Sequence, residues 1–464
     1  MNMYLKELLN IPKCLATFKG DVRQLNRPIN AVAIDSRKVS TGDVFVAIRG
    51  ERLDGHQFLP EAIQRGALAV LVDQNWIKAN KHEYLKANLF IVSDTLMALQ
   101  ELANNYRRKF TIPIIGLTGS VGKTTTKEMM AAILSQKYGV HKNEGNLNNH
   151  YGVPLTLFQL SEKHEIAIVE MGANHFGEIQ RLAEIAEPTH AIITAVGRAH
   201  LEFFGSVEGV ARAKLELFEV IKEHGVAFVN VDDPMIVQKM PDVNRKITYG
   251  FENEADIKGE ILGCDSHGFV TFGLMGQQIQ LKTAGLHQAK NALAAAVVGV
   301  EFGIQPSLIK EALEAYQPYS KRMEVLDIDG IRVINDCYNS NPDSAAAALQ
   351  VLHDMRARGR KIAVLADMLE LGQASEFEHR KIGELASQLG LDGLFGFGSM
   401  TRFTVETAKP TLKDRARHFE EKDKLISFLN DFLKKGDVVL IKGSRGMAME
   451  EITVAIESYG SMML

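Results

Sequence analysis

The sequence is poor in cysteine, with only Cys14, Cys264 and Cys337 among its 464 residues. The three lie far apart and are odd in number. They therefore indicate neither a disulfide framework nor a zinc cluster, both of which need several cysteines at characteristic spacings. Reduced thiols in a protein core are the simpler interpretation, so we predict a cytoplasmic location.

The sequence also lacks a long apolar run. No segment approaches the ~20 apolar residues with which a helix crosses a membrane. At the N-terminus, Lys6 and Glu7 stand where a signal peptide has its apolar segment. We therefore expect a soluble protein that has no membrane span and is not exported.

Positive charge is not in excess, because 53 Lys and Arg residues are offset by 57 Asp and Glu residues, for a net charge of −4. Nucleic-acid binding calls for a clustered basic face, so we predict no nucleic-acid partner. The hydrophobic content of 46% with 24% charged residues is typical of a globular protein. The length exceeds one hydrophobic core and suggests about three domains of ~100–200 residues each.

The strongest motif lies at residues 112–126. A β-branched run predicts a strand, two glycines frame a short loop, and Lys123-Thr124 opens a helical pattern. In such a loop, backbone N–H groups and a helix N-terminus attract phosphate oxygens. Lys123 would reach the β- and γ-phosphates of a nucleotide, and Thr124 would place its hydroxyl on Mg²⁺. The candidate loop residues are Gly119, Ser120, Val121, Gly122, Lys123, Thr124 and Thr125.

The match to the strict pattern G-x-x-x-x-G-K-[ST] is incomplete. Its first glycine would fall at Leu117, whereas the sequence has Gly116 one place earlier. The alternative is a glycine-rich turn between a strand and a helix, with a chance Lys-Thr. The apolar strand before the loop and the helical pattern after it favour the nucleotide site.

Two further apolar strands of the central segment end in polar residues. Residues 166–169 lead to Glu170, and residues 190–196 lead to His200. In open parallel α/β sheets, ligands bind beyond the carboxyl ends of the strands, so these tails are expected to face the same crevice as Lys123. Glu170 is placed for a carboxylate directed at Mg²⁺. The alternatives are a helix N-terminal charge for Glu170 and a surface histidine for His200.

Other polar residues carry weaker signals. Asn146, Asn148 and Asn149 offer amides that could grip a peptide-like substrate, although asparagine also favours plain turns. Lys214 lies on a predicted helix, where a lysine is usually solvated. Asp35-Ser36-Arg37 closes a short strand near the N-terminus, where it is either a ligand-binding loop or a surface turn.

The order of patterns predicts an α/β protein of three domains. Residues 1–108 form a small α/β domain, residues 109–318 carry the phosphate loop on a central parallel sheet, and residues 319–464 form a second doubly wound, Rossmann-like sheet without a phosphate loop of its own. We expect the link between the last two domains around residues 318–324.

Taken together, the motifs resemble the Mur ligases, ATP-dependent amide-bond-forming enzymes of bacterial cell-wall (peptidoglycan) synthesis. The resemblance covers all three domains. Matching segments follow the order of the family: residues 35–37, 118–125, 146–154, 200–206, 287–291, 322–324 and 442–445. Residues 170–175, 336–342 and 365–372 resemble the branch that adds D-alanyl-D-alanine, and the Asp-Asn-Pro-Arg motif of the branch that adds the third residue is absent.

The resemblance implies a ligase that joins D-alanyl-D-alanine to UDP-N-acetylmuramoyl-tripeptide, with ATP and two Mg²⁺ ions as cofactors. ATP would phosphorylate the terminal carboxylate of the tripeptide, and the incoming amine would displace phosphate from the acyl phosphate. Such chemistry mainly demands positioning and neutralisation of negative charge. We predict that the enzyme acts as a monomer.

The resemblance also implies roles for individual residues. Lys123 would stabilise the transferring phosphate, and Thr124 with Glu170 would hold one Mg²⁺. His200 would bind the second Mg²⁺ beside Lys214, the family lysine that is carbamoylated. The other implied contacts are Asn291 to adenine, Arg322 and Asp336 to the nucleotide, and Asp35, Ser36 and Arg37 to UDP.

Three points stay open. Gln288 replaces an asparagine of the family pattern, which puts one contact near the adenine in doubt. A nucleotide-gated switch or transport ATPase is an alternative from another class, and a folylpolyglutamate synthase is a nearer one. The residues do not distinguish lysine from diaminopimelate at the third position of the peptide.

Overall fold

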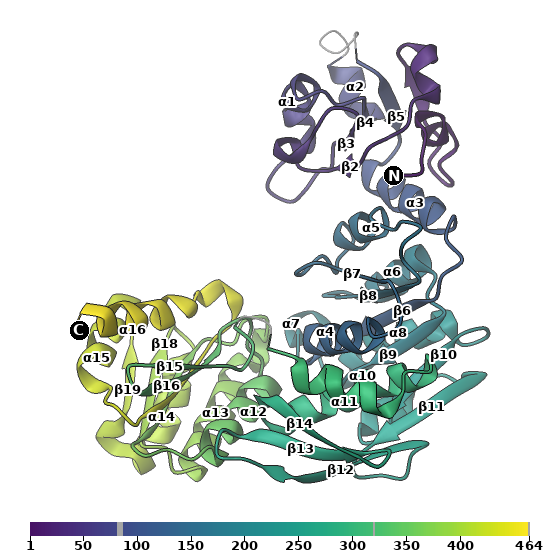
Figure 1. Ribbon diagram of the computed structural model, residues 1–464. Helices are drawn as coiled ribbons and strands as arrows, with labels where there is room; N and C mark the ends of the chain where they lie inside the picture. Colours follow the sequence, from purple (N-terminus) through teal and green to yellow (C-terminus); the bar gives the residue numbers. More distant parts are fainter. Residues whose placement is uncertain (81–86, 319–320, 463–464) are drawn as a thin grey trace.

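Three β-sheets organise the computed structural model, which describes residues 1–80, 87–318 and 321–462 (Figure 1). The strands of each sheet all come from one of the three predicted domains. The boundaries at residues 108 and 318 stay predictions, and Tyr319 and Ser320 of the predicted link lie outside the described residues. The described residues contain no helix with both the length and the apolar character needed to cross a membrane.

The N-terminal domain has a five-stranded sheet in the order β1-β5-β4-β3-β2. Strand β1 is antiparallel to β5, and the other neighbours are parallel. Its inner strands β3 and β4 consist almost entirely of buried apolar residues. The elements are β1 (Thr17–Lys19), β2 (Val32–Ala33), β3 (Val44–Val46), β4 (Ala69–Asp73), β5 (Leu89–Val92), α1 (Leu59–Gln64), α2 (Gln74–Ala79) and the short 3-10 helices η1 (Leu5–Asn10), η2 (Val22–Asn26), η3 (Ser36–Lys38) and η4 (Gly55–Phe58).

Helix α3 (Thr95–Arg107) connects the N-terminal and central domains, and Figure 1 shows it between them. Its first turn is capped by Asp94, whose carboxylate accepts a hydrogen bond from the N–H of Met97. Its last turn is held by the central domain: the Tyr106 hydroxyl donates to the Leu160 carbonyl at 2.8 Å, and Nε of Arg107 donates to the Ala186 carbonyl at 2.7 Å. The apolar side chains of α3 belong to one cluster that extends into both domains.

The central domain has a nine-stranded sheet in the order β14-β13-β12-β11-β10-β9-β6-β8-β7. Neighbours from β7 to β12 are parallel, and β6 lies between β8 and β9. The elements are β6 (Ile114–Thr118), β7 (Val140–Lys142), β8 (Ile166–Glu170), β9 (His190–Ile193), β10 (Val226–Asn230), β11 (Arg245–Gly250), β12 (Ile257–Cys264), β13 (Phe269–Leu274), β14 (Gln277–Ala284), α4 (Lys123–Leu134), α5 (Gly152–Leu157), α6 (Glu178–Ala186), α7 (Leu201–Phe204), α8 (Val207–Ile221), α9 (Pro234–Lys239), α10 (Leu286–Glu301) and α11 (Pro306–Ala315).

Helices cover both faces of the parallel part of this sheet. Helices α4, α10 and α11 pack on one face, and α5, α6 and α8 pack on the other. Successive strand residues face opposite sides, so Ile114 belongs to one cluster and Ile115 to the other. Burial on both faces explains why these strands appear in the sequence as continuous apolar runs.

The antiparallel strands β12, β13 and β14 extend the sheet and were not predicted. Along β13 and β14, buried residues alternate with more exposed ones, so these strands lack the continuous burial of the parallel strands. Strand β14 shows this alternation, with Ile279 and Leu281 buried between exposed polar neighbours. The turn before it, Met275-Gly276, has positive φ at both residues, as a tight hairpin requires.

The C-terminal domain has a six-stranded sheet in the order β15-β16-β20-β17-β18-β19. Strand β15 is antiparallel to β16, and the other neighbours are parallel. The second doubly wound sheet predicted for this part of the chain is confirmed. The elements are β15 (Glu324–Ile328), β16 (Ile331–Asp336), β17 (Lys361–Ala366), β18 (Gly393–Phe397), β19 (Ala416–Phe419), β20 (Val438–Lys442), α12 (Pro342–Asp354), α13 (Ser375–Gln388), α14 (Thr401–Leu412), α15 (Lys422–Phe432), α16 (Glu450–Met462), η5 (Gly372–Ala374), η6 (Lys413–Arg415) and η7 (Arg445–Met447).

Candidate active site

The predicted phosphate loop joins β6 to the N-terminus of α4. Two of its glycines are required by their surroundings. Gly119 has φ of +150° and Gly122 has φ of +82°, a left-handed region that other residues rarely adopt. A Cβ atom would lie 2.0 Å from Oγ1 of Thr194 at Gly119, and 2.2 Å from Oδ1 of Asn291 at Gly122. The loop is thus packed against β9 on one side and α10 on the other, with the first N–H groups of α4 directed outward from the helix end.

The side chain of Lys123 folds back over this loop. Its ammonium group donates a hydrogen bond to the Gly119 carbonyl at 2.6 Å. Burial lowers the pKa of Lys123, while the negative charge of Glu170 favours the protonated form and Arg322 disfavours it. The geometry holds a cation at the position where a phosphate-binding lysine is expected.

Thr124 and Glu170 meet at the carboxyl ends of the central strands. The Thr124 hydroxyl donates to Oε2 of Glu170 at 3.2 Å, and it accepts a hydrogen bond from Nη2 of Arg322 at 3.0 Å. Nδ2 of Asn148 donates to Oε1 of Glu170 at 2.8 Å. The predicted residues of three separate motifs therefore form one cluster. Arg322 brings the C-terminal domain to it.

Lys127 is a member of this cluster that was not predicted. Its side chain is fully buried, with Nζ 2.9 Å from the Asn143 carbonyl oxygen and 3.5 Å from Oε2 of Glu170. Nδ2 of Asn143 donates a hydrogen bond to the Glu170 carbonyl at 3.2 Å, and Oδ1 of Asn143 accepts one from the Glu170 N–H at 2.6 Å. The sequence signal that could have identified Lys127 is its position four residues after Lys123, on the same face of a helix with many apolar residues. The arrangement fixes the orientation of the Glu170 carboxylate.

Lys214 is almost fully buried, so the alternative that it is a solvated helix lysine is wrong. Its Nζ lies 3.4 Å from the Ala173 carbonyl oxygen and 5.6 Å from the centre of the Phe204 ring. The ring of His200 also packs against Phe204, with centroids 6.4 Å apart. Burial, and then the positive charge of Lys123, lower the pKa of Lys214 to about 7. The two residues predicted for the second metal site therefore both lie next to one aromatic ring, that of Phe204.

His200 is only partly exposed and contacts the C-terminal domain. Its Nδ1 lies 2.5 Å from Oε2 of Glu370, a residue that was not singled out in the sequence. Asp336, also in the C-terminal domain, is fixed by Lys442, whose Nζ donates to Oδ2 at 2.6 Å. Asn291 lies beside the loop glycine Gly122. His200 therefore lies at a contact with the C-terminal domain, Asp336 lies beside Lys442 within that domain, and Asn291 lies at the phosphate loop.

The remaining candidates lie away from the phosphate loop or bond locally. Asp35 and Arg37 form an exposed ion pair of 2.8 Å on η3 in the N-terminal domain, and Ser36 donates to Oε2 of Glu61 at 2.6 Å. Asn149 accepts hydrogen bonds from the N–H groups of Tyr151 and Gly152, which is the turn role considered as its alternative.

Asn146 is exposed on the loop before Asn148. A cavity of about 320 Å³ adjoins this region, and it is lined by Asn149, His150, Gly172, Phe176, Gly177, Glu178, Arg181 and Leu182. It lies between the asparagine loop and the tail of β8. The cavity thus offers space next to two of the predicted substrate-binding elements.

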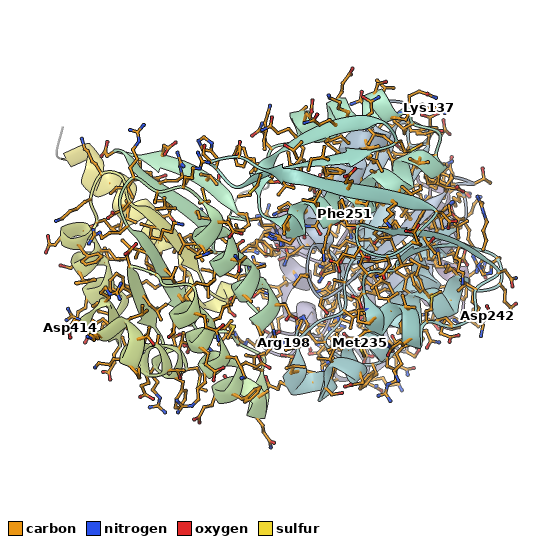
Figure 2. The ribbon with its side chains drawn as sticks, turned by 90° about the horizontal axis from the view of Figure 1, so that it is seen from below. Lys137, Arg198, Met235, Asp242, Phe251 and Asp414 are labelled. Atoms are coloured by element: carbon orange, nitrogen blue, oxygen red, sulfur yellow. The ribbon has the colours of Figure 1, made fainter. Side chains whose placement is uncertain are left out.

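Arg198 fastens the C-terminal domain to the central domain, and Figure 2 shows it at the border between them. Its backbone N–H and guanidinium group donate to both carboxylate oxygens of Asp343 at 2.6–2.9 Å, and Nη1 donates to Glu378 at 2.8 Å. Half-buried, charge-assisted hydrogen bonds of this kind are stronger than exposed ion pairs.

We expect Arg198→Gln to shift the ligand-free protein toward a more open arrangement of the last domain, because the contacts to Asp343 and Glu378 weaken together. An ATP analogue with the UDP-linked substrate is expected to restore the compact form, as with other closing domains. Small-angle scattering of both proteins, with and without these ligands, measures this. Arg380→Gln is the control, since its ion pair with Glu376 lies within α13. Identical profiles for Arg198→Gln and wild type would contradict the expectation.

Comparison with known proteins gives a consistent result along the chain. The models of the Mur ligase family catalytic domain, the Mur ligase middle domain and the Mur ligase glutamate ligase domain match residues 28–107, 117–299 and 321–445. UDP-N-acetylmuramoyl-tripeptide--D-alanyl-D-alanine ligase of Bacillus subtilis (strain 168) is 38% identical over 426 residues, which cover 91% of this chain and 92% of that protein.

Solved structures agree with the sequence relatives. A crystal structure of MurF from Acinetobacter baumannii superimposes with a TM-score of 0.87 at 29% identity, covering 98% of both chains. The MurF ligase from Thermotoga maritima, crystallised in complex with ADP, gives a TM-score of 0.82 at 29% identity, covering 94% of this chain and 98% of that one.

Proposed function

The chain belongs to the Mur ligase family, and we propose that it uses ATP to join D-alanyl-D-alanine to UDP-N-acetylmuramoyl-tripeptide in peptidoglycan precursor synthesis. The observation that carries the proposal is the shared cluster of Thr124, Glu170 and Arg322 beside the phosphate loop. Two domains contribute to one nucleotide site, and the relative that carries this activity in its name aligns over nine-tenths of the chain.

In the proposed reaction, the terminal carboxylate of the tripeptide attacks the γ-phosphorus of ATP and releases ADP. The amine of D-alanyl-D-alanine then attacks the acyl phosphate carbon, and the tetrahedral intermediate expels phosphate as the amide forms. The chain's residues act by position and charge. Lys123 holds a cation against the transferring phosphoryl group, and the loop N–H groups orient the phosphates.

The donor set around Thr124 suits Mg²⁺. A hydroxyl and the Glu170 carboxylate are hard oxygen ligands, and Mg²⁺ characteristically adds substrate phosphates and waters to one or two protein groups. Among the described residues no group of three or more His, Cys, Asp and Glu side chains is arranged to hold a metal. A site in which Thr124 and Glu170 supply two oxygen ligands and ATP supplies others agrees with both the small number of protein ligands and the preference of Mg²⁺ for phosphate oxygens. Bound there, Mg²⁺ would supply neutralisation of the phosphate charge.

We assign a second Mg²⁺ to His200 and Lys214, the latter as its carbamate, which would turn a buried cation into an oxygen ligand. The buried position of Lys214 and its pKa of about 7 support this, because a neutral amine is the form that reacts with carbon dioxide. Carboxylate-type oxygens are the ligands that Mg²⁺ prefers.

The substrate contacts follow the domains. We assign UDP to Asp35, Ser36 and Arg37 of the N-terminal domain. We assign binding of the peptide to the asparagine loop, which contains Asn146, Asn148 and Asn149. In the nucleotide site, we assign the adenine contact to Asn291. Arg322 and Asp336 would approach ATP from the C-terminal domain. We also propose that the enzyme acts in the cytoplasm as a monomer.

The proposed function can be tested by leaving out each of the three substrates in turn. We expect release of ADP and phosphate only when ATP, UDP-N-acetylmuramoyl-tripeptide and D-alanyl-D-alanine are all present, because the amine must consume the acyl phosphate for turnover. Tripeptides ending in lysine and in diaminopimelate are compared, and the amide product is identified by mass spectrometry. Phosphate release that is indifferent to the dipeptide would instead favour a nucleotide-gated switch or transport ATPase.

A further inference from the structure

The end of strand β16 in the C-terminal domain holds the turn that carries Arg322. One carboxylate oxygen of Asp336, Oδ1, accepts a hydrogen bond from the N–H of Met323 at 3.1 Å. Two residues further along the chain, the N–H of Tyr338 donates to the Lys321 carbonyl at 3.1 Å. The backbone on both sides of Arg322 is therefore bound to the same short segment.

This turn has an unusual backbone conformation. The φ angle is +65° at Lys321 and +51° at Met323, so a left-handed residue stands on each side of Arg322. Residues other than glycine keep this conformation only where their surroundings enforce it, and such positions concentrate at functional sites. Oδ2 of Asp336 accepts a hydrogen bond from Nζ of Lys442 at 2.6 Å, so both oxygens of the carboxylate that holds the turn are engaged. The direction in which the Arg322 side chain leaves the backbone is thus fixed.

The aromatic ring of Tyr338 supports the Arg322 side chain itself. Cζ of the guanidinium group lies 3.8 Å from the centre of the ring. A planar guanidinium group stacks favourably on an aromatic face, because the ring attracts the cation while the N–H groups still point outward in the guanidinium plane. From this position Nη2 donates to the Thr124 hydroxyl at 3.0 Å, which joins the C-terminal domain to the central domain.

Arg322 also has hydrogen-bonding capacity that the protein does not use. Its Nε atom is buried and has no hydrogen-bond partner among the described residues. A guanidinium group has five N–H donors and no acceptor, and pairs of these donors match the oxygens of a phosphate group. The group therefore lies beside Thr124 with a donor that is not satisfied within the protein.

We infer that Tyr338 is a positioning residue for the nucleotide site: its ring holds the Arg322 guanidinium group against Thr124, where the phosphates of ATP are expected. The aromatic face performs this task, and the hydroxyl group of Tyr338 has no part in it. The C-terminal domain then delivers an arginine whose orientation is set before the nucleotide binds. The inference rests on the proposed function for the identity of the anion, whereas the contact between ring and guanidinium group is independent of it.

The contact is tested in the ligand-free protein by NMR of arginine labelled with ¹⁵N. An Nε–H group above an aromatic face has an upfield ring-current shift, and the signal that is missing from Arg322→Lys identifies Arg322. We expect the shifted signal in wild type and in Tyr338→Phe, and its return to the ordinary range in Tyr338→Leu. Absence of a shifted Arg322 signal from the wild-type spectrum would overturn the inference, and so would a shift that survives in Tyr338→Leu.

Turnover supplies the second readout. We expect Tyr338→Leu to lower kcat/KM for ATP by about 3- to 30-fold, the range that a cation–π contact accounts for, and to leave KM for D-alanyl-D-alanine unchanged. Tyr338→Phe is expected to behave as wild type, because it keeps the ring. The matched control is Phe403→Leu, which removes a ring of the same domain that Arg380 and Arg402 contact at 4.6 Å. A loss for Tyr338→Leu no larger than that for Phe403→Leu would contradict the inference.

A double-mutant comparison separates support of Arg322 from a direct contact with the nucleotide. Calorimetry with a non-hydrolysable ATP analogue measures affinity even where turnover is lost. If Tyr338 acts through Arg322, Tyr338→Leu weakens binding of the analogue in the wild-type background and adds little in an Arg322→Ala background. An equal loss of affinity in both backgrounds would refute the positioning role. A wild-type protein that bound the analogue but failed to use D-alanyl-D-alanine would contradict the proposed function and leave the result on Tyr338 standing.

Discussion

Replacing Lys123 with alanine is expected to lower ligase turnover by about 10²–10³-fold or more, because one preorganised charge at a transferring phosphoryl group is removed. The Nζ atom lies on the phosphate loop, 2.6 Å from the Gly119 carbonyl oxygen. No other residue of the loop carries a positive charge. Steady-state release of ADP and phosphate with all three substrates measures the effect.

The fold is expected to survive this change, since alanine is a strong helix former at the start of α4. Thermal unfolding and circular dichroism of Lys123→Ala check this point. Lys137→Ala is the matched control. Lys137 lies just beyond the end of α4, is exposed, and appears at the margin of the molecule in Figure 2. A Lys123→Ala protein with near-normal turnover would contradict the assignment of the phosphate loop.

Lys214→Ala is expected to cause a comparably severe loss, because a buried cation at this position can serve the reaction only after conversion to an anion. Carbamoylation forms a bond between Nζ and the carbon of carbon dioxide and releases one proton, leaving two oxygens that can face Mg²⁺. Short carboxylic acids are expected to restore part of the activity of Lys214→Ala by occupying the vacated space. The measurement is turnover as a function of added acetate or formate.

The pH dependence follows from the same group. Burial lowers the pKa of Lys214 to about 7, so the fraction of neutral amine rises as the pH increases through that value. At a fixed concentration of dissolved carbon dioxide, reactivation of carbon-dioxide-depleted enzyme is therefore expected to be faster at pH 8 than at pH 6. An ordinary lysine, with a pKa near 10.4, would be almost fully protonated at both pH values.

Two further variants define this result. Lys214→Glu is expected to recover little, because its shorter side chain cannot place a carboxylate where the carbamate would lie. Lys222→Ala, at the end of the same helix α8, removes a lysine that pairs with Glu219 at the surface and is expected to behave as wild type. Normal turnover of Lys214→Ala in the absence of carbon dioxide would contradict the assignment.

Prediction from the sequence was most successful for motifs formed by consecutive residues. The phosphate loop and the tail of β8 follow from consecutive residues, because a parallel sheet brings the carboxyl ends of its strands to one edge. Thr124, Glu170 and Asn148 accordingly meet in the structure. The strands β12–β14 were missed, and in β12 and β14 the reason is that exposed polar residues break the apolar runs on which the strand predictions relied.

Contacts between domains were beyond the reach of local patterns. Arg198 looked like an ordinary loop residue, yet it meets Asp343 from a domain some 145 positions along the chain. Glu370 stood in a recognised segment without an assigned task. Lys214 had the helical context of a surface residue, and its burial depends on packing against Phe204 from another helix. Such facts arise from tertiary arrangement, which residue spacing does not encode.

The packing of α3 also determines which domains unfold together. A single cluster of buried side chains runs from Met3 through α3 to Val243, whereas the two clusters of the last sheet draw their buried members, apart from Ala284, from residues beyond 322. Regions that share a core tend to unfold together. The first two domains therefore constitute one melting unit and the last domain another. Severing the chain after residue 108 would split a large shared core, whereas severing it near residue 320 would separate only Ala284 from the buried members of the last domain's core.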